Sequence, residues 1–143
     1  MKRPRTRVIA LAVIEHPDRP ALLVSEGFDQ SRQQRFHRLL GGGVHFQELG
    51  AEAVARELRE ELGVEIRVER LAGVLENIFT YEGRPGHEIA LVFTACFEDR
   101  ALYRRDRFAG IEEEPVDALW RPVGESGCSI PLYPPGVLEL LRT

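Results

Sequence analysis

A chain of 143 residues with 43% hydrophobic and 29% charged residues has an ordinary globular composition, and we expect a single domain over residues 1–143. Its formal net charge of −4 offers no basic field for polymeric nucleic acid, so we expect no such partner. No apolar run approaches the roughly 20 residues that cross a bilayer, so no membrane partner is expected either.

The two cysteines favour a reducing compartment. Cys96 and Cys128 are far apart in sequence and lack the spacing of metal ligands, so we expect two free thiols. The basic start of the chain leads into an apolar segment without a small-residue cleavage site, which we interpret as a buried strand rather than a signal peptide. We therefore expect a cytoplasmic protein.

Three strands are predicted before residue 41. Val8–Ile14 and Ala21–Ser25 are short aliphatic runs separated by the turn sequence HPDRP, which predicts a hairpin. The polar stretch Gly27–Gln34 is interpreted as a loop at the edge of a site. Arg35–Leu40 then predicts a strand that leads into a cluster of three glycines.

The segment Gly42–Val64, GGVHFQELGAEAVARELREELGV, predicts a turn followed by a helix that ends at Gly63. Glu57, Glu60 and Glu61 are spaced i, i+3 and i+4, so their carboxylates share one helix face. Like charges so spaced destabilise a helix, and a hard divalent cation would compensate. For the helix alone, a solvated surface helix is an equally good interpretation. A neighbouring stripe is expected to pack on the core: Ala51, Ala55, Leu58 and Leu62.

The second half of the chain predicts more strands and a final helix. Glu65–Tyr81 and His87–Phe97 are rich in β-branched and aromatic residues and predict a long antiparallel pair. Four polar positions on this pair face either a ligand cleft or solvent: Glu76, Asn77, His87 and Glu88. The rest reads as an exposed charged stretch at Arg100–Arg107, an acidic loop at residues 110–115, a strand at Val116–Pro122 and a helix at Pro135–Leu141. This order of strands and helices predicts an α/β fold with a mixed sheet between helices.

The acidic helix and the glycines before it share one strict pattern. Gly42, five residues, Glu48, seven residues and then the run Arg56 to Val64, RELREELGV, resembles the 23-residue signature of the Nudix hydrolase family with every fixed position filled. The resemblance implies an α/β/α sandwich with a mixed β-sheet. It also implies metal-dependent hydrolysis of the diphosphate linkage of a nucleoside diphosphate joined to another moiety X, with a metal-activated water as nucleophile.

The resemblance assigns roles to the residues of the pattern. Glu57 and Glu61 correspond to the principal ligands of Mg²⁺ or Mn²⁺, with Glu60 as a further ligand. Gly42 would let a main-chain carbonyl reach the metal where a Cβ would obstruct it. Arg56 would hold a neighbouring carboxylate, Glu48 or Glu57, in one rotamer.

Outside the pattern, several residues remain candidates. Relatives often supply one more carboxylate from the region of the acidic loop, so Glu112, Glu113 or Glu114 is a candidate ligand or base. We assign Glu113 as the possible metal ligand, and a solvated charge run is the alternative. The proton acceptor stays open among Glu60, Glu48 and this loop.

Two arginines and two histidines are weaker candidates. Arg35 and Arg38 are candidates for binding the diphosphate, although surface arginines on an edge strand explain them equally well. His37 and His45 are candidates for titration near the site, although single histidines are more often structural or exposed.

Two rival functions remain on the same fold: a non-hydrolytic nucleotide-binding or regulatory module, and an isoprenoid-diphosphate isomerase. The complete pattern favours hydrolysis of a small-molecule, nucleotide-derived diphosphate. It does not identify X, because specificity would come from loops and strand side chains outside the pattern. The oligomeric state is open, a homodimer included.

Overall fold

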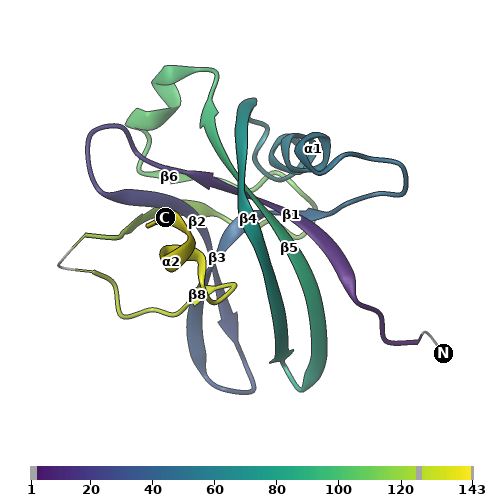
Figure 1. Cartoon of the computed structure of the whole chain (residues 1–143). Helices are drawn as coiled ribbons and strands as arrows, with labels where there is room; N and C mark the ends of the chain where they lie inside the picture. Colours follow the sequence, from purple (N-terminus) through teal and green to yellow (C-terminus); the bar gives the residue numbers. More distant parts are fainter. Residues whose placement is uncertain (1–2, 125–126, 143) are drawn as a thin grey trace.

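A mixed sheet of eight strands forms the centre of the molecule, shown in Figure 1 as a computed structural model that describes residues 3–124 and 127–142. The strands follow the order β4-β5-β1-β3-β2-β7-β6, with β8 beside β3. β1 runs parallel to β5, β8 runs parallel to β3, and the other pairs are antiparallel. The strands are β1 (Arg7–Ile14), β2 (Ala21–Asp29), β3 (Gln34–Gly43), β4 (Ile66–Tyr81), β5 (Arg84–Phe97), β6 (Arg107–Phe108), β7 (Ala118–Pro122) and β8 (Leu132–Tyr133).

Helices cover both faces of this sheet. α1 (Gly50–Leu62) packs on one face and the short α2 (Val137–Leu141) packs on the other, while a 3₁₀ helix, η1 (Arg100–Arg104), follows β5. The α/β class and the mixed sheet between helices are therefore confirmed. No helix within residues 3–124 and 127–142 is long and apolar enough to cross a membrane.

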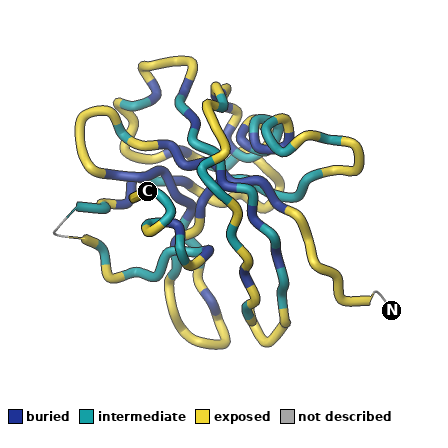
Figure 2. The backbone as a smooth tube through the Cα atoms, viewed as in Figure 1, coloured by how far each residue is buried: buried dark blue, intermediate teal, exposed yellow. Residues whose placement is uncertain are grey.

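β1 lies in the middle of the core and explains the unbroken apolar run in its sequence. Ala10, Ala12 and Ile14 face the cluster under α1, whereas alternate residues such as Ile9 and Leu11 face the cluster under α2. A strand that is buried on both faces has no place for polar side chains. Figure 2 shows this burial as a band through the centre of the fold.

The predicted hairpin between the first two strands is wrong. β1 pairs with β3 and β5, and its contact with β2 is limited to an isolated bridge between Glu15 and Leu22. The turn itself forms, since the His16 amide donates to the Ala21 carbonyl at 2.9 Å. Beyond this turn β3 lies between the two strands, so turn chemistry alone did not identify the pairing partner.

The predicted loop at Gly27–Gln34 is also wrong. β2 continues to Asp29 and β3 begins at Gln34, so the polar residues lie on a hairpin whose turn is residues 30–33. The Asp29 carboxylate accepts hydrogen bonds from the amides of Ser31 and Arg32, which stabilises the turn. These polar residues extend the sheet and provide one wall of a cavity described below.

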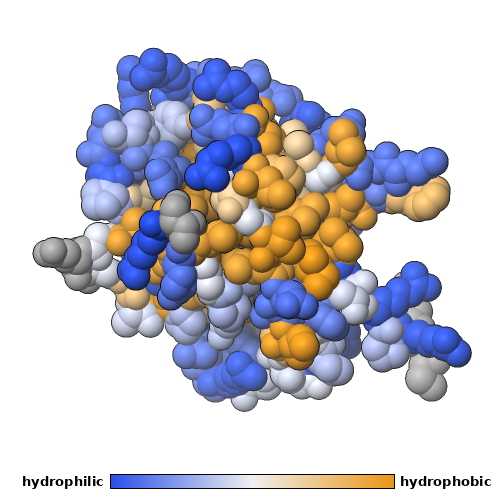
Figure 3. All heavy atoms as spheres, in the orientation of Figure 1, coloured by the Kyte–Doolittle hydropathy of each residue, from blue (hydrophilic) through white to orange (hydrophobic). Residues whose placement is uncertain are grey.

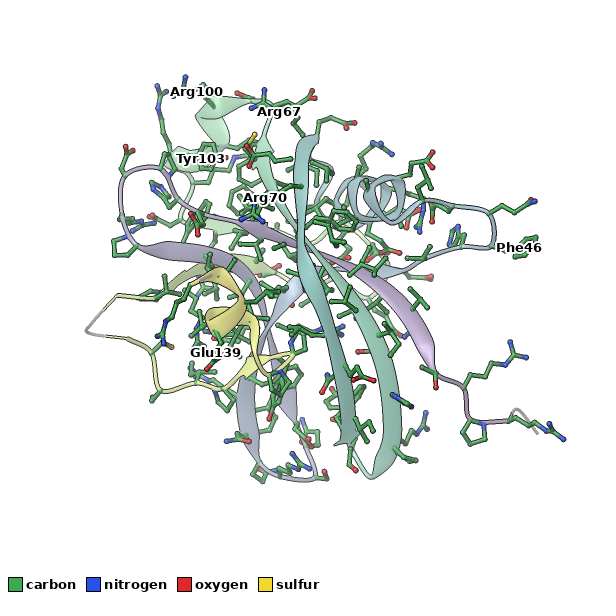
Figure 4. The ribbon with its side chains drawn as sticks, viewed as in Figure 1. Phe46, Arg67, Arg70, Arg100, Tyr103 and Glu139 are labelled. Atoms are coloured by element: carbon green, nitrogen blue, oxygen red, sulfur yellow. The ribbon has the colours of Figure 1, made fainter. Side chains whose placement is uncertain are left out.

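The long antiparallel pair is confirmed as β4 and β5, and β4 forms one edge of the sheet. Two register shifts interrupt the pair, between Val68 and Arg70 and between Leu71 and Gly73. Hydrophobic side chains gather over β4 beside α1 (Figure 3), and Ile78 is 79% exposed. Arg67 and Arg70 lie on the first half of the same strand (Figure 4).

The buried stripe of α1 differs from the prediction. Leu58 and Leu62 are buried as expected, but Ala53 and Val54 are buried in place of Ala51 and Ala55, which are only partly buried. Relative to the prediction, α1 is thus rotated about its axis so that its acidic face lies closer to the sheet. Val54 and Glu61, seven residues apart, lie about 20° from each other around the helix axis. The rotation that buries Val54 therefore also turns Glu61 toward the sheet.

The other predicted elements need small corrections. The charged stretch Arg100–Arg107 includes η1 and the first residue of β6. Tyr103 of η1 packs against Phe97, with ring centroids 5.0 Å apart. The final helix, α2, begins at Val137 rather than Pro135. The strand after the acidic loop, β7, begins at Ala118 rather than Val116.

Candidate active site

The glycines at the end of β3 allow the closest approach between the sheet and α1. A Cβ on Gly42 would lie 2.5 Å from Cδ of Glu57 and 2.6 Å from one of its oxygens. Gly41 has a φ of 145°, and a Cβ there would overlap the carbonyl oxygen of Ala10 in the neighbouring strand. The absence of side chains here brings main-chain atoms beside the Glu57 carboxylate.

Arg56 connects the carboxylates of the motif. Its Nε donates to Glu48 Oε2 at 2.8 Å and its Nη2 donates to Glu48 Oε1 at 3.0 Å, a bidentate pair. Its Nη1 donates to Glu57 at 3.0 Å and to Glu60 at 3.1 Å, and its Nη2 also donates to the carbonyl of Gly43 at 2.9 Å. One guanidinium thus joins the end of β3, the loop after it and α1.

The electrostatics of this cluster are dominated by the pair of Arg56 and Glu48. Hydrogen bonds from Arg56, followed by the one from the His45 amide, lower the pKa of Glu48 to about 2. Hydrogen bonding to Glu48 likewise raises the pKa of Arg56 above its ordinary value. Glu48 is therefore ionised and is a weak proton acceptor.

Glu61 has a different environment. Its Oε1 is buried and finds no hydrogen-bond partner within the described part of the chain. Burial, followed by the negative charges of Glu57 and Glu112, raises the pKa of Glu61 to about 8, against the opposing charge of Arg38. A buried carboxylate that lacks a donor is unfavourable unless a proton or a cation joins it.

The acidic loop lies against the end of α1. The Ile111 amide donates to the carbonyl oxygen of Glu61 at 2.9 Å, and the Gly110 amide donates to Asp117 at 3.0 Å. Among the three loop glutamates, Glu112 is the one whose charge acts on Glu61. Within the described residues, the loop acts on the cluster through the Ile111 amide and the charge of Glu112, and no interaction of Glu113 with the cluster is found.

A cavity of about 340 Å³ opens beside Glu61. Arg38 and Glu61 both line it, whereas Arg35 does not. The reason is strand geometry: residues three apart in a strand point to opposite faces, so Arg35 and Arg38 of β3 cannot both face the cavity. Of the two predicted arginines, the structure places only Arg38 beside the acidic cluster.

Two of the four polar positions on the β4–β5 pair also line the cavity. Asn77 and Glu88 are paired across the two strands and are buried, 8% and 7% exposed. Glu76 lies on the opposite face of β4 and is exposed, and His87 hydrogen-bonds the Thr6 hydroxyl at 3.1 Å. The alternation along a strand separates these neighbours.

Several residues that line the cavity carried no signal in the sequence. They come from the β2–β3 hairpin, the β4–β5 hairpin and β8, and they include Ser25, Asp29, Phe36, Phe79, Tyr81 and Tyr133. The tips of the two hairpins meet where the Gln30 amide donates to Glu82 at 3.2 Å. Only the pairing order of the strands, which local patterns do not reveal, brings these segments together.

The two predicted histidines lie outside the acidic cluster. His37 is buried on the face of β3 opposite Arg38, where Nε2 donates to Glu26 at 3.0 Å and Nδ1 accepts from Arg121 at 3.0 Å. Burial is the main cause that lowers the pKa of His37, and the hydrogen bond to Glu26 opposes it. His45 is exposed, with Nδ1 3.9 Å from Glu48. Beside it Phe46 projects from the loop before α1 (Figure 4).

Three carboxylates of the motif, those of Glu48, Glu57 and Glu60, are gathered around Arg56. In residues 3–124 and 127–142, no three acidic, histidine or cysteine side chains converge in an arrangement suited to a metal ion. Glu57 and Glu60 both turn toward Arg56, while Glu61 turns toward the cavity.

Comparisons with known proteins agree with this architecture. The family model described as NUDIX domain matches residues 4–133. A NUDIX hydrolase from Nitrosomonas europaea is 18% identical with a TM-score of 0.67, covering 96% of this chain and 87% of that chain. A MutT NUDIX hydrolase from Burkholderia pseudomallei is 24% identical with a TM-score of 0.65, covering 96% of this chain and 97% of that chain.

A structure described as UDP-X diphosphatase is 18% identical with a TM-score of 0.62, covering 99% of this chain and 64% of that chain. No curated protein shows significant similarity to the chain. The solved structures establish the fold, and the family model extends over most of the sequence, including the complete motif. The chain therefore belongs to the Nudix hydrolase family.

Proposed function

We propose that this Nudix hydrolase cleaves the diphosphate linkage of a nucleoside diphosphate joined to another moiety X. The observation that carries the proposal is Glu61, a carboxylate on the wall of the cavity with a buried oxygen that no described protein group hydrogen-bonds. Arg38 lines the same cavity and supplies a fork of donors for phosphate oxygens. The cavity would therefore hold a negatively charged diphosphate beside the positive charge of Arg38 and beside a carboxylate, Glu61, that is placed to bind a cation.

The surroundings of Glu61 fit a divalent cation. The orphaned oxygen of Glu61, the Glu57 carboxylate and the main chain at Gly42 supply the hard oxygen ligands that Mg²⁺ and Mn²⁺ prefer. We propose that Glu57, Glu61 and the Gly42 carbonyl hold the cation, with Glu60 as a further ligand. Such a cation neutralises charge on a diphosphate and lowers the pKa of a coordinated water.

Arg56 and Glu48 act as positioning residues in this proposal. Arg56 holds the Glu57 and Glu60 side chains through hydrogen bonds of 3.0 and 3.1 Å. Glu48 in turn fixes Arg56 through both carboxylate oxygens. Its pKa of about 2 argues against a role as the base.

In the proposed reaction, a water oxygen forms a bond to one phosphorus while the bond to the leaving phosphate breaks on the opposite side. The proton of the water passes to a carboxylate, for which Glu60 and the loop glutamates remain the candidates. Of the loop residues, Glu112 is favoured over Glu113 because its charge already acts on Glu61. Arg38 would orient the diphosphate for this in-line attack.

A panel of nucleoside diphosphate derivatives incubated with Mg²⁺ tests the proposal. We expect release of a nucleotide and a phosphorylated product from at least one member. Glu57→Gln should lower the rate by about 100-fold or more while the fold is kept. Glu65→Gln is a matched control, because it removes the same charge just beyond α1, where the described part of the chain pairs the Glu65 carboxylate with Arg59 alone.

Each rival function predicts a different outcome in this panel. Binding of a nucleotide without any product would indicate the non-hydrolytic module, and rearrangement of an isoprenoid diphosphate without phosphate release would indicate the isomerase. Wild-type rates for Glu57→Gln would overturn the assignment of the metal ligands.

We further propose that residues 1–143 act as one cytoplasmic domain on a small-molecule substrate. The free thiols of Cys96 and Cys128 support a reducing compartment. The structurally similar UDP-X diphosphatase is named for a substrate of the proposed kind. The assembly, monomer or homodimer, would be decided by measuring the mass in solution.

A further inference from the structure

The cavity beside Glu61 contains a pair of polar side chains that the proposed chemistry does not use. Asn77 of β4 and Glu88 of β5 are partners in the strand register, and both line the cavity. Each is more than nine-tenths buried. They lie among apolar residues of the same sheet face, such as Ile9 and Leu11, where polar groups are unfavourable without partners.

These two side chains have few partners in the protein. Within the described residues, no hydrogen bond reaches the Asn77 amide, and the one ionic contact of Glu88 is with Arg7 at 3.6 Å. Arg7 itself is 61% exposed. Among the described residues, the fully buried side-chain polar atoms without a partner belong to Glu61 and Arg121, so the polar atoms of Asn77 keep contact with the space of the cavity. An amide that no protein group satisfies and that opens only into a cavity is placed to bind what enters it. A ligand group in the cavity would supply the missing partner.

The walls of the cavity suit a flat ring. Phe36 lies 5.7 Å from Tyr81 and 6.0 Å from Tyr133 between ring centroids, and Phe79 lines the cavity with them. Aromatic side chains of this kind bind planar heterocycles by stacking, with little dependence on the sequence of the base. The walls therefore favour a nucleobase, and the polar pair would distinguish among bases.

The chemistry of the polar pair indicates which base. An ionised carboxylate only accepts hydrogen bonds, whereas an amide both donates and accepts. The matching ligand edge has two adjacent donors and a carbonyl oxygen. The pairing edge of guanine has this pattern, with N1–H and the 2-amino group as donors and O6 as acceptor. Adenine and cytosine present a ring nitrogen lone pair toward the carboxylate, and uracil presents one donor between two carbonyls.

We propose that Asn77 and Glu88 select a guanine base in the substrate, with Glu88 accepting from N1–H and the 2-amino group and Asn77 donating to O6. The diphosphate of the same molecule would extend toward Arg38 and Glu61, which line the same cavity. The inference deepens the proposed function by naming the substrate class, but the selection of the base can be measured without any turnover.

Equilibrium binding of GDP, IDP, ADP and UDP to the wild-type protein, followed by calorimetry without divalent cations, is the first test. IDP differs from GDP by the loss of the 2-amino group alone. GDP should bind about tenfold or more tightly than IDP, since one hydrogen bond to a charged group is lost. Equal affinity for the four nucleotides would overturn the proposal, and this comparison needs no variant to fold.

Variants then assign the selectivity to residues. Glu88→Gln should bring the GDP to IDP ratio to within about threefold of one, and Asn77→Leu should weaken both ligands because both carry O6. Glu76→Gln is the matched control: it removes the same charge from the neighbouring position of β4, on the exposed face. A ratio that persists in Glu88→Gln, with the far-ultraviolet circular dichroism unchanged, would overturn the role of Glu88.

A purely structural role for Glu88 makes a different prediction. If Glu88 served only to pair with Arg7, Arg7→Gln would abolish guanine selectivity to the same extent as Glu88→Gln. We expect Arg7→Gln to keep the GDP to IDP ratio. If Glu88→Gln fails to fold, Asn77→Asp tests the pair instead, because an ionised aspartate cannot donate to O6 and should weaken GDP binding about tenfold or more.

Failure of the inference and failure of the proposed function give separate results. Guanine-selective binding without hydrolysis of any guanosine diphosphate derivative would remove the hydrolase and keep the base site. Hydrolysis of the diphosphate panel with no preference among bases, or with a preference set only by X, would keep the hydrolase and remove the base site.

Discussion

Replacement of Glu61 by Gln should make the protein more stable and less active at the same time. Glu61→Gln keeps the shape of the side chain and removes its ability to ionise. The pKa of Glu61 rises from 4.5 to about 8 on folding, chiefly because the carboxylate is buried. Each pKa unit corresponds to about 1.36 kcal/mol, so the full effect on unfolding is about 3–5 kcal/mol.

The sign of this effect follows from proton linkage. Because the folded protein holds this proton more tightly than the unfolded chain, the contribution to stability is complete below about pH 4.5. It is lost as the pH rises through about 8. Glutamine does not titrate, so the stability of Glu61→Gln should not follow this decline. Above pH 8 the variant should unfold with a free energy that exceeds the wild-type value by about 3–5 kcal/mol.

Urea unfolding with a chelator present, at several pH values between 5 and 9, measures the difference. Trp120 is the one tryptophan of the sequence and is buried, so its fluorescence reports unfolding. Glu61→Gln should also lose about 100-fold or more in turnover with Mg²⁺, since it removes a proposed ligand. A difference between the two proteins that stays constant from pH 5 to 9 would refute the argument from burial.

Three further predictions concern the neighbours of this carboxylate. Arg56→Lys keeps the charge but loses the bidentate pair and the shared contacts, so turnover should fall about 10–100-fold at equal Mg²⁺, and an unchanged rate would refute its positioning role. Gly42→Ala should weaken Mn²⁺ binding, measured by calorimetry, about tenfold or more by displacing a carboxylate 2.5 Å from the new methyl group. Gly43→Ala, whose methyl group would meet only the Arg7 guanidinium, should not. Because burial lowers the pKa of His37, stability should fall as the pH drops below about 6.5. His37→Asn, which can still accept from Arg121, should flatten the urea midpoint between pH 5 and 7, and an equal slope in both proteins would contradict this cause.

The acidic motif could be predicted because it lies within one helix and the loop before it. Spacing along a helix fixes which side chains are neighbours, so the relation of Glu57, Glu60 and Glu61 followed from the sequence. The pairing of Arg56 with Glu48 could also be predicted from the motif. The burial of Glu61 was not, because it depends on the rotation of α1 on the sheet, which Val54 and Ala53 set.

The walls of the cavity could not be predicted, because they depend on contacts between segments far apart in sequence. Asn77 and Glu88 meet only in the register of β4 and β5, and that register is altered by two bulges. Phe36 and Tyr133 come together because β8 pairs with β3, and β3 is inserted between β1 and β2. The turn sequence after β1 indicated where the chain reverses but carried no information about this insertion.

The outer side of β4 has a consequence for how the protein behaves at high concentration. A long edge strand with exposed Val74 and Ile78 invites a second molecule to continue the hydrogen-bond ladder and to aggregate. The two bulges break the straight template that such growth requires, and Arg67 and Arg70 place like charges along it. The same two bulges that shift the register of the strands carrying Asn77 and Glu88 thus also hinder the addition of a further strand to this edge.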